Sequence, residues 1–376
     1  MYITGIGRTK FGNLSKSLIE LAYEAMFNAI SDSPLDITDI DAIYVSNFLG
    51  GPLNGQLHLN SSIASLLPGL NIPIIRVETA CASSSVALNQ AVHSLGKFSN
   101  VMVIGVEKMT DTKNTHPTDA IAMAADHNID YQNGLIFPAA YGLITQQYMN
   151  KYGIGHEILE KLAYINHKNA NLNPLAHFSY KDVSHNMIKD SPIVAAPITL
   201  FDCSPISDGA AAVIISNEKS SDRDIEILSS QVSTDSISIT QRDNLTSFKA
   251  VKTASKKAYD EAGIRAQDID ILEVHDCFTI NELIALEDLQ ICGPGEASEL
   301  IENGSINIDG DIPVNTDGGL KANGHPIGAT GLAQIFEVVS QLRSEAGKRQ
   351  VDSPEIGLAH NIGGIGGTAG ITIMRG

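Results

Sequence analysis

The chain has 376 residues, a length that allows two domains or one large domain built from two halves. Its 43% apolar content, with 32 glycines and 18% charged residues, is typical of a compact α/β enzyme. The net charge of −18 argues against nucleic acid or an anionic membrane as a partner, because both would be repelled. The cysteines form no C-x-x-C pair, so we expect a reducing compartment rather than a disulfide framework or a zinc finger: they are Cys81, Cys203, Cys277 and Cys292.

The ends of the sequence give no sign of export or of a membrane anchor. Residues 1–5 (MYITG) run directly into the first expected strand without a signal peptide, and no apolar run reaches the roughly 18 residues of a membrane span. Residues 374–376 (MRG) are not a peroxisomal address. We therefore expect a cytoplasmic protein.

Cys81 lies at the start of a predicted helix and is a candidate nucleophile. Residues 74–77 (IIRV) read as a short buried strand, and the small residues 82–85 (ASSS) open a helix with apolar positions at helical spacing, namely Leu88, Ala91, Val92 and Leu95. The unpaired N–H groups of a helix N-terminus favour a thiolate, so we expect them to lower the pKa of this cysteine. Taken alone, a single cysteine is more often a buried structural residue, and the nucleophile hypothesis depends on motifs elsewhere in the chain.

The next segment, residues 111–196, is long, polar and rich in histidine. Within it, residues 155–162 (GHEILEKL) are helix-like, and residues 151–190 carry five lysines and four histidines against four acids. That basic stretch either relieves the repulsion of an anionic substrate or is an ordinary solvated surface. Residues 209–216 (GAAAVIIS) then form an apolar strand, so we read 111–196 as an inserted lobe that covers the site.

Two stretches of the chain repeat each other without gaps. Residues 27–41 align with residues 256–270, and both end in Asp-Ile-Asp before an expected strand, at 42–46 and at 271–275. Later, the helix of Leu88, Ala91, Val92 and Leu95 matches a second apolar set, which is Leu332, Ile335, Phe336 and Val339.

The offset between these two helices also carries Cys81 onto His325, and strands at 101–106 and 356–360 follow them. The repeat predicts two similar halves, 1–219 and 220–376, each a mostly parallel sheet covered by helices. Packed about a pseudo-twofold axis, the halves would place Cys81 and His325 at equivalent helix N-termini.

Three motifs of the second half carry further candidates. Residues 273–278 (EVHDCF) end a buried strand and place His275 and Cys277 at its terminus. Residues 323–331 (NGHPIGATG) surround a histidine with glycines that allow close backbone approach, and with a proline suited to a first helical turn. Residues 360–367 (HNIGGIGG) form a glycine-rich loop after a strand, which can aim N–H groups at an oxyanion.

Each motif also has a simpler interpretation. The glycine-rich loop lacks both G-x-G-x-x-G spacing and a Walker lysine, His360 is most simply a core histidine, and Cys203 and Cys292 are most simply packing residues. Zinc binding by Cys277 with His275 and His325 is disfavoured, because the three lack the usual ligand spacing.

Together, these segments resemble the thiolase family, most closely its sterol-carrier-protein-2-type and archaeal acetyl-CoA C-acetyltransferase branch. The resemblance covers essentially the whole chain. It rests on the Cys81 turn, residues 202–209 (DCSPISDG), the His-Asp-Cys-Phe box, the Gly-His-Pro-Ile-Gly-Ala-Thr-Gly box and the His-Asn-Ile-Gly-Gly-Ile-Gly-Gly segment. It implies a five-layered αβαβα fold of two duplicated halves, with residues 111–196 as an inserted CoA-binding loop domain.

The resemblance implies acyl exchange between thiols, with coenzyme A thioesters as substrates and neither a cofactor nor a metal. Cys81 would take an acetyl group from acetyl-CoA while His325 accepts the thiol proton. The carbanion of a second acetyl-CoA would then attack the thioester to give acetoacetyl-CoA, and thiolysis is the reverse. The implied donors to the enolate oxygen are His325 and a water held by His275, and those to the acyl-enzyme oxygen are the backbone N–H groups of Cys81 and Gly363. The residues that bind coenzyme A stay unidentified.

One position departs from the family pattern. Most thiolases keep a second cysteine in a Cys-x-Gly box near the C-terminus as acid and base, whereas this chain has Asn361 there. In the sterol-carrier branch the cysteine of the His-Asp-Cys-Phe box serves instead, which nominates Cys277.

Alternatives within and outside catalysis remain. A longer-chain 3-ketoacyl-CoA thiolase is the alternative most similar in chemistry. A condensing enzyme that makes hydroxymethylglutaryl-CoA or β-ketoacyl carrier protein is disfavoured by the Gly-His-Pro box. A non-catalytic subunit that binds acyl-CoA is disfavoured by the intact set of Cys81, His275, Cys277 and His325. The family further implies a homodimer or tetramer, with residues 101–106 or a neighbouring strand at the interface. It also implies a complex with hydroxymethylglutaryl-CoA synthase and a small zinc-ribbon OB-fold protein.

Overall fold

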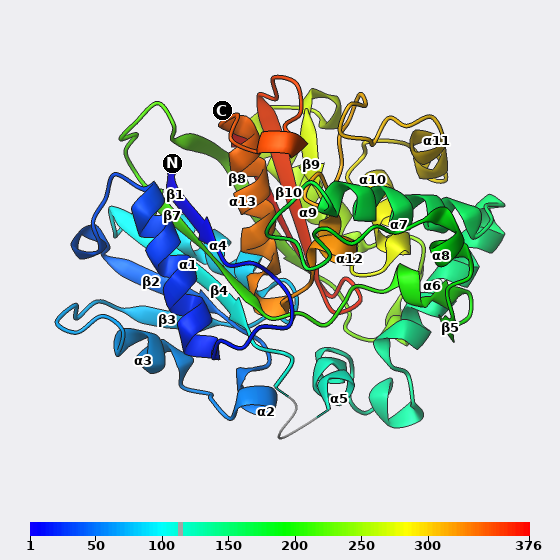
Figure 1. The fold of residues 1–376 in the computed structure, drawn as a ribbon, viewed down its shortest axis with the longest axis horizontal. Helices are drawn as coiled ribbons and strands as arrows, with labels where there is room; N and C mark the ends of the chain where they lie inside the picture. The colour runs from blue at the N-terminus through cyan, green and yellow to red at the C-terminus, as the bar shows by residue number, and fades with distance from the viewer. Residues whose placement is uncertain (112–115) are drawn as a thin grey trace.

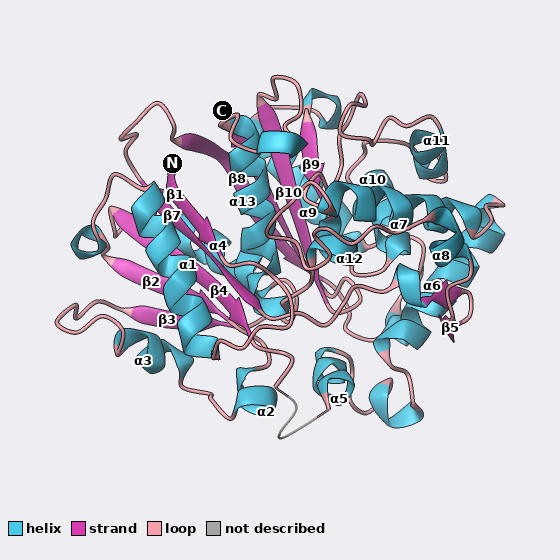
Figure 2. Ribbon diagram, viewed as in Figure 1, coloured by secondary structure: helices cyan, strands magenta, loops and turns pink. Residues whose placement is uncertain are grey.

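A computed structural model describes residues 1–111 and 116–376, and within them nine strands form one mixed sheet (Figures 1 and 2). The strand order is β3-β2-β4-β7-β1-β8-β11-β10-β9. The first five of these strands come from the first part of the chain: β1 (Tyr2–Arg8), β2 (Ala42–Ser46), β3 (Ile74–Val77), β4 (Asn100–Glu107) and β7 (Gly209–Ser216). The other four come from the second part: β8 (Ile225–Thr234), β9 (Ile271–Glu273), β10 (Ile356–Gly363) and β11 (Thr368–Arg375).

The strand pairings of the second part repeat those of the first. β2 is parallel to β3 and β4, while β4–β7 and β7–β1 are antiparallel. In the same way β9 is parallel to β10, while β10–β11 and β11–β8 are antiparallel. The counterpart of the β2–β3 pair is a single parallel bridge between Leu272 and Val314.

The expectation of mostly parallel sheets is therefore wrong. β10 and β11 are joined by the short turn 364–367, and a connection this tight permits only an antiparallel pair. Only the strand pairs that are linked through helices, such as β2–β4 and β9–β10, are parallel.

The duplicated sequence Asp-Ile-Asp makes the same contact twice. The Asp41 carboxylate accepts a hydrogen bond from the backbone N–H of Asn100, at 3.0 Å, and so holds the start of β4. The Asp270 carboxylate accepts one from the N–H of Ile356, at 2.8 Å, and holds the start of β10. The repeated residues thus fix equivalent parallel strand pairs.

Two helices pack between the two parts of the sheet. α4 (Ser83–Ser94) and α13 (Thr330–Leu342) contact each other and strands of both parts, and they share one apolar core, to which they contribute Leu88, Ala91, Leu332, Ile335 and Val339. On the outer faces, α1 (Leu18–Asp32) covers β1, β4 and β7, and α9 (Lys249–Ala262) covers β8 and β11. The layers run helix, sheet, helix, sheet, helix, which confirms the predicted fold class.

The pairing of β1 with β8 joins the two parts of the sheet. It involves Tyr2 opposite Glu226 and Ile3 opposite Ile225, at the start of both strands. The division of the chain at residue 219 and the inserted loop domain at 111–196 stay predictions, and residues 112–115 of that insert lie outside the described residues.

The segment from 116 to 202 forms the lobe beside the second part of the sheet in Figure 1. Its elements are α5 (Pro117–Ile121), α6 (Phe137–Tyr152), α7 (Glu157–Ala170), α8 (His185–Lys189), β5 (Ile193–Ala195) and β6 (Ile198–Thr199). Side chains of α6 and α7 share an apolar core with α10 (Thr279–Asp288). The remaining α-helices are α2 (Gly50–Asn54), α3 (Leu59–Ala64), α11 (Ala297–Glu302) and α12 (Gly319–Asn323). Among the described helices, none has the length and apolarity needed to cross a membrane.

Candidate active site

Cys81 is presented by a sharp turn between β3 and α4. The Ser83 hydroxyl accepts a hydrogen bond from the Thr79 N–H at 2.9 Å and donates one to the Ala80 carbonyl at 2.5 Å. Ala80 has a φ of 52°, in the left-handed region that non-glycine residues seldom occupy. The turn leaves Cys81 7% exposed, with α4 beginning two residues later.

The environment of this thiol differs from the expectation. Burial raises the pKa of Cys81 to about 12, and Glu107 adds to the rise, while the backbone N–H groups of Gly364 and of Cys81 itself oppose it. Desolvation outweighs the helix N-terminus here because the sulfur is taken out of water. The lowered pKa expected from the sequence is wrong for the unliganded site, which holds a neutral thiol.

His325 lies in a loop between α12 and a 3₁₀ turn at Ile327–Ala329 that precedes α13. It is therefore five residues before the equivalent helix, not at its first turn, because Pro326 introduces the 3₁₀ turn instead. Gly324 before it has a φ of +111°, and a Cβ there would come within 2.9 Å of the Ser207 hydroxyl. Only glycine lets the chain enter this loop.

The hydrogen bonds of His325 define its tautomer. The Thr330 hydroxyl donates its proton to the Pro326 carbonyl at 3.0 Å, so at its 2.7 Å contact with His325 Nδ1 it can only accept. Nδ1 then carries the proton and Nε2 has the free lone pair. Burial lowers the pKa of His325 to about 3, which keeps the ring neutral and able to take a proton.

His275 follows β9, which ends at Glu273, earlier than expected. The next backbone N–H groups leave the sheet: that of Val274 donates to the Asn315 side chain at 2.8 Å, and that of His275 is 3.4 Å from His360 Nδ1. The side-chain amide of Asn361 donates to His275 Nδ1 at 2.8 Å. Burial, with His325 and His360 beside it, lowers the pKa of His275 well below its ordinary value.

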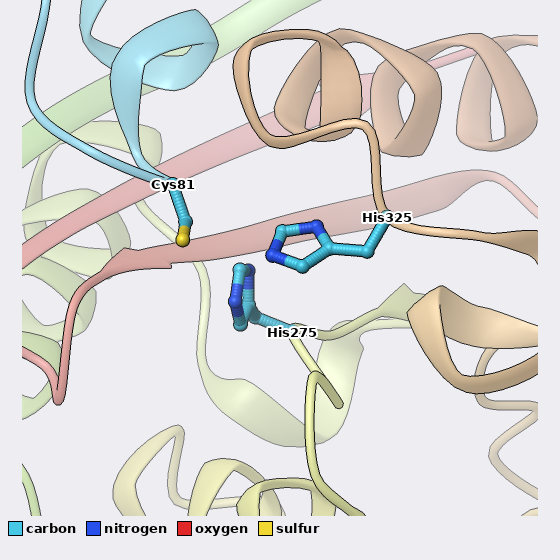
Figure 3. Close-up of side chains that lie close together, drawn as sticks. All are labelled: Cys81, His275 and His325. Atoms are coloured by element: carbon cyan, nitrogen blue, oxygen red, sulfur yellow. The ribbon is translucent and has the colours of Figure 1, made fainter. Parts of the chain in front are cut away.

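The structure brings Cys81, His275 and His325 together, and their catalytic roles stay predictions. The Cys81 sulfur and one ring nitrogen from each histidine lie within 4.8 Å of one another, and the two imidazole rings are perpendicular with centroids 5.1 Å apart. Figure 3 shows both rings directed toward the Cys81 sulfur, each from a different element. These three atoms form a nitrogen and sulfur donor set of the kind that binds a soft metal. That the protein holds no resident metal stays a prediction.

Cys277 lies next to this group, just before α10, and is 7% exposed. The Asn281 amide donates to its sulfur at 3.2 Å. Burial and the nearby Cys81 raise the pKa of Cys277, while the side chains of Tyr141 and Asn281 beside the sulfur oppose the rise. Tyr141, on α6, stacks on Phe278 with ring centroids 4.4 Å apart, and its hydroxyl donates to the Gly364 carbonyl at 3.2 Å.

The two cysteines and His325 line one cavity of about 340 Å³. The segment predicted to cover the site contributes to its wall through Thr118, Ile121, Phe137, Pro138 and Val194. Cys203 lines it as well, whereas the five lysines of residues 151–190 do not. These lysines therefore do not offset the negative charge of a substrate from within the described wall of this cavity.

The glycine-rich segment reaches the site as the end of a strand and a turn. Gly363 is the last residue of β10, and a Cβ there would meet the Thr79 carbonyl at 2.5 Å. Gly364, with a φ of +60°, turns its N–H toward the Cys81 sulfur and lines the cavity. The role of Gly363 as an oxyanion donor stays a prediction, and Gly364 is a neighbour that was not predicted from the sequence.

Other residues at the site were not predicted either. Thr330 stands inside the Gly-His-Pro box, so its place five residues after His325 was an available signal. Asn281 follows Cys277 by one helical turn, which was a weaker signal. Tyr141 comes from a distant helix with no motif around it, and nothing in the sequence indicates its contact.

Comparisons with known proteins extend over the whole chain. Residues 1–219 match the family described as "Thiolase, N-terminal domain", and residues 231–376 match "Thiolase C-terminal domain-like". The chain is 44% identical over 379 residues to "Acetyl-CoA acetyltransferase" of Methanothermobacter thermautotrophicus, which covers 99% of this chain and 98% of that protein. It is 33% identical over 397 residues to "Sterol carrier protein 2" of Homo sapiens, with 100% and 72% covered. A solved structure described as "Ltp2-ChsH2(DUF35) aldolase" has a TM-score of 0.86 at 24% identity, with 99% of this chain and 97% of that one covered.

Proposed function

Because the chain belongs to the thiolase family and is an acyltransferase, we propose that it is an acetyl-CoA C-acetyltransferase. It would join two molecules of acetyl-CoA into acetoacetyl-CoA and coenzyme A, and would catalyse the reverse thiolysis. The observation that carries this proposal is the Cys81 thiol beside the His325 ring, whose Nε2 atom is free to accept a proton.

The first step is transfer of the acetyl group to Cys81. His325 Nε2 takes the thiol proton as the sulfur attacks the acetyl carbonyl, and the bond to coenzyme A breaks. The departing thiolate takes its proton from Cys277, which is left as a thiolate. The N–H groups of Cys81 and Gly363 are the proposed donors to the oxygen of the tetrahedral intermediate.

The second step forms the carbon–carbon bond. The Cys277 thiolate removes a methyl proton from a second acetyl-CoA, and the carbanion attacks the acetyl group on Cys81. The Cys81 sulfur leaves and regains its proton from the imidazolium of His325. During this step the enolate oxygen needs donors, and the proposed ones are His325 and a water held by His275.

A longer-chain 3-ketoacyl-CoA thiolase is the second candidate, and the cavity favours it. At about 340 Å³ the cavity is much larger than an acetyl group needs, and the side chains on its wall are mainly apolar: Met109, Ile121, Phe137, Val194, Ile206 and Phe278. Part of this volume would hold the pantetheine arm, and the apolar remainder is the observation that makes a longer acyl chain the second candidate.

Two measurements test the proposal. Radiolabelled acetyl-CoA should label Cys81, so the wild type and a Cys292→Ser control should take up label while Cys81→Ala should not. Absence of label in the wild type would overturn the enzyme hypothesis and favour a non-catalytic acyl-CoA-binding subunit.

Thiolysis rates with acetoacetyl-CoA and with 3-ketodecanoyl-CoA then separate the two substrate classes, since a short-chain enzyme should prefer the former at least tenfold.

The assembly of the protein is a separate proposal. β4 cannot supply an intersubunit strand, because β2 and β7 pair with both of its edges. β3 is an edge strand, and its Ile75 is 43% exposed, so we propose a homodimer or tetramer that uses this edge. The second name in "Ltp2-ChsH2(DUF35) aldolase" supports a search for a partner protein. The proposed partners are hydroxymethylglutaryl-CoA synthase and a zinc-ribbon OB-fold protein, to be tested by light scattering of the purified mixtures.

A further inference from the structure

Asn361 bridges the two parts of the fold behind the candidate site. It lies on β10 and is 1% exposed. Its carbonyl oxygen accepts a hydrogen bond from the Ser85 hydroxyl on α4, at 3.0 Å, and its amide nitrogen donates to His275 Nδ1 at 2.8 Å. One side chain thereby links the helix that follows Cys81 to one of the imidazoles.

The direction of these bonds determines where the His275 proton lies. A ring nitrogen that accepts a hydrogen bond carries no proton, so the neutral ring carries its proton on Nε2. In the described residues His275 Nε2 is buried and has no hydrogen-bond partner. Leaving a buried donor unpaired costs free energy, so an unpaired donor at this site calls for a partner, which a bound substrate can supply.

We propose that Asn361 is a positioning residue that holds His275 as the Nε2–H tautomer, so that this N–H donates directly to the enolate oxygen. The inference rests on the proposed acetyltransferase function for the identity of that oxygen. It replaces the water expected between His275 and the substrate with a direct hydrogen bond. It also gives Asn361 a task at the position where most thiolases have their second cysteine.

The amide is suited to this task because its two ends differ. A carboxylate at position 361 would only accept, and would select the opposite tautomer or a charged ring. The Ser85 hydroxyl supplies the donor that keeps the carbonyl end of Asn361 turned away from His275. Without that donor the amide can rotate by half a turn and accept from Nδ1 instead.

The first experiment measures the tautomer in the free protein. Protein labelled with ¹⁵N-histidine is studied by long-range ¹H–¹⁵N correlation between pH 6 and pH 8, with the signals of His275 assigned through His275→Gln. The expected result is a bare Nδ1 and a protonated Nε2. A protonated Nδ1, whether in the opposite tautomer or in a charged ring, would overturn the proposal. This spectrum does not depend on turnover, so its failure is distinct from failure of the acetyltransferase proposal.

The second experiment removes the amide. Asn361→Leu keeps the side-chain size, and it should leave His275 in a mixture of tautomers. It should slow methyl proton exchange of acetyl-CoA in proportion to the lost Nε2–H fraction, up to the roughly 10²–10³ of one lost oxyanion donor if the opposite tautomer predominates, while acetylation of Cys81 changes only a few-fold. An equal fall in both steps, or an unchanged spectrum, would contradict the positioning role.

Two further variants keep the test decisive. Ser85→Ala leaves Asn361 in place but frees it to rotate, so it should shift the same signals in the same direction by a smaller amount, even if the leucine variant does not fold. Ser84→Ala is the matched control, because its hydroxyl accepts from the Leu332 N–H at 3.3 Å instead of contacting the amide. A shift of the His275 signals in Ser84→Ala as large as in Ser85→Ala would count against the proposal.

Discussion

The imidazoles of His275 and His325 meet at a right angle, and their Nδ1 atoms have hydrogen-bond partners of opposite kind. His325 Nδ1 faces a hydroxyl that can only accept, whereas His275 Nδ1 faces an amide that donates. One ring therefore offers a lone pair and the other an N–H in the same small space. Neither needs to be charged before substrate binds, which agrees with the lowered pKa of both rings.

Thr330→Val should weaken the base. The valine has the same shape but cannot accept from His325 Nδ1, so the ring loses its fixed tautomer. We expect acetylation of Cys81 to slow on the order of tenfold, equivalent to about 1.4 kcal/mol in the barrier. Stopped-flow measurement of coenzyme A release checks this. Thr330→Ser retains the hydroxyl and should stay near wild-type rates; equal rates in all three proteins would show that the hydroxyl does not orient the ring.

Alkylation of Cys81 should accelerate with pH without levelling off near neutrality. Because burial raises the pKa of this thiol to about 12, the thiolate fraction rises roughly tenfold per pH unit over the accessible range. The rate of inactivation by iodoacetamide between pH 6 and pH 9.5 measures this, with mass spectrometry to locate the label. A plateau that begins below pH 7 would mean that the site holds a thiolate paired with an imidazolium.

Cys277→Ala should separate the two proposed steps. The variant should lose condensation by at least about 10², the lower range for a general base, because it removes the proposed base. Cys81 should still be alkylated by iodoacetamide at a near wild-type rate. Cys203→Ala is the control, since that thiol lines the same cavity but bonds to the Thr199 carbonyl. Wild-type condensation by Cys277→Ala would exclude Cys277 as the base.

His156→Gln should change the pH dependence of stability. Its hydrogen bond to the Asp202 carboxylate, at 2.8 Å, raises the pKa of His156. A raised folded pKa contributes stability that is complete below the unfolded value of about 6.5 and is lost as the pH rises through the folded pKa. The Tm difference between wild type and His156→Gln should therefore be larger at pH 6 than at pH 9.

The matched control for that experiment is His93→Gln, an exposed position on α4. This variant controls for the loss of a histidine as such, and at pH 6 its effect on Tm should be smaller than that of His156→Gln. Working at or above pH 6 also avoids the acid range in which Asp202, whose own pKa is lowered by His156, would lose its contribution. A His156 difference that grows from pH 6 to pH 9 would contradict the assigned ion pair.

The fold was predictable because the chain repeats itself. The alignment of 27–41 with 256–270, and of the helix after Cys81 with the helix after His325, is sufficient to place both residues where the two parts of the fold meet. Strand direction was not predictable in the same way, since the turn that reverses β10 into β11 looked like a loop serving the site. The predicted lowering of the Cys81 pKa was wrong, because a sequence shows that a helix follows the cysteine but does not show how deeply the sulfur is buried.

The side chains that surround Cys277 could not be predicted from the sequence, for a different reason. Tyr141 approaches it from the segment of residues 116–202, where neither a repeat nor a motif fixes the distance between the two residues. Asn361 was visible only as a departure from the family pattern. Its hydrogen bonds depend on the register of β10 against β9 and on the position of α4.

The pairing of β1 with β8 gives the molecule a seam, and the candidate chemistry lies across it. Cys81 belongs to one side of the seam, and His275, Cys277 and His325 belong to the other. A fragment of residues 1–219 would hold a nucleophile without a base, and a fragment of residues 220–376 would hold bases without the Cys81 nucleophile. Activity then requires the two parts of the chain to pack together. The apolar contact between α4 and α13 is as necessary to turnover as any of the reactive side chains.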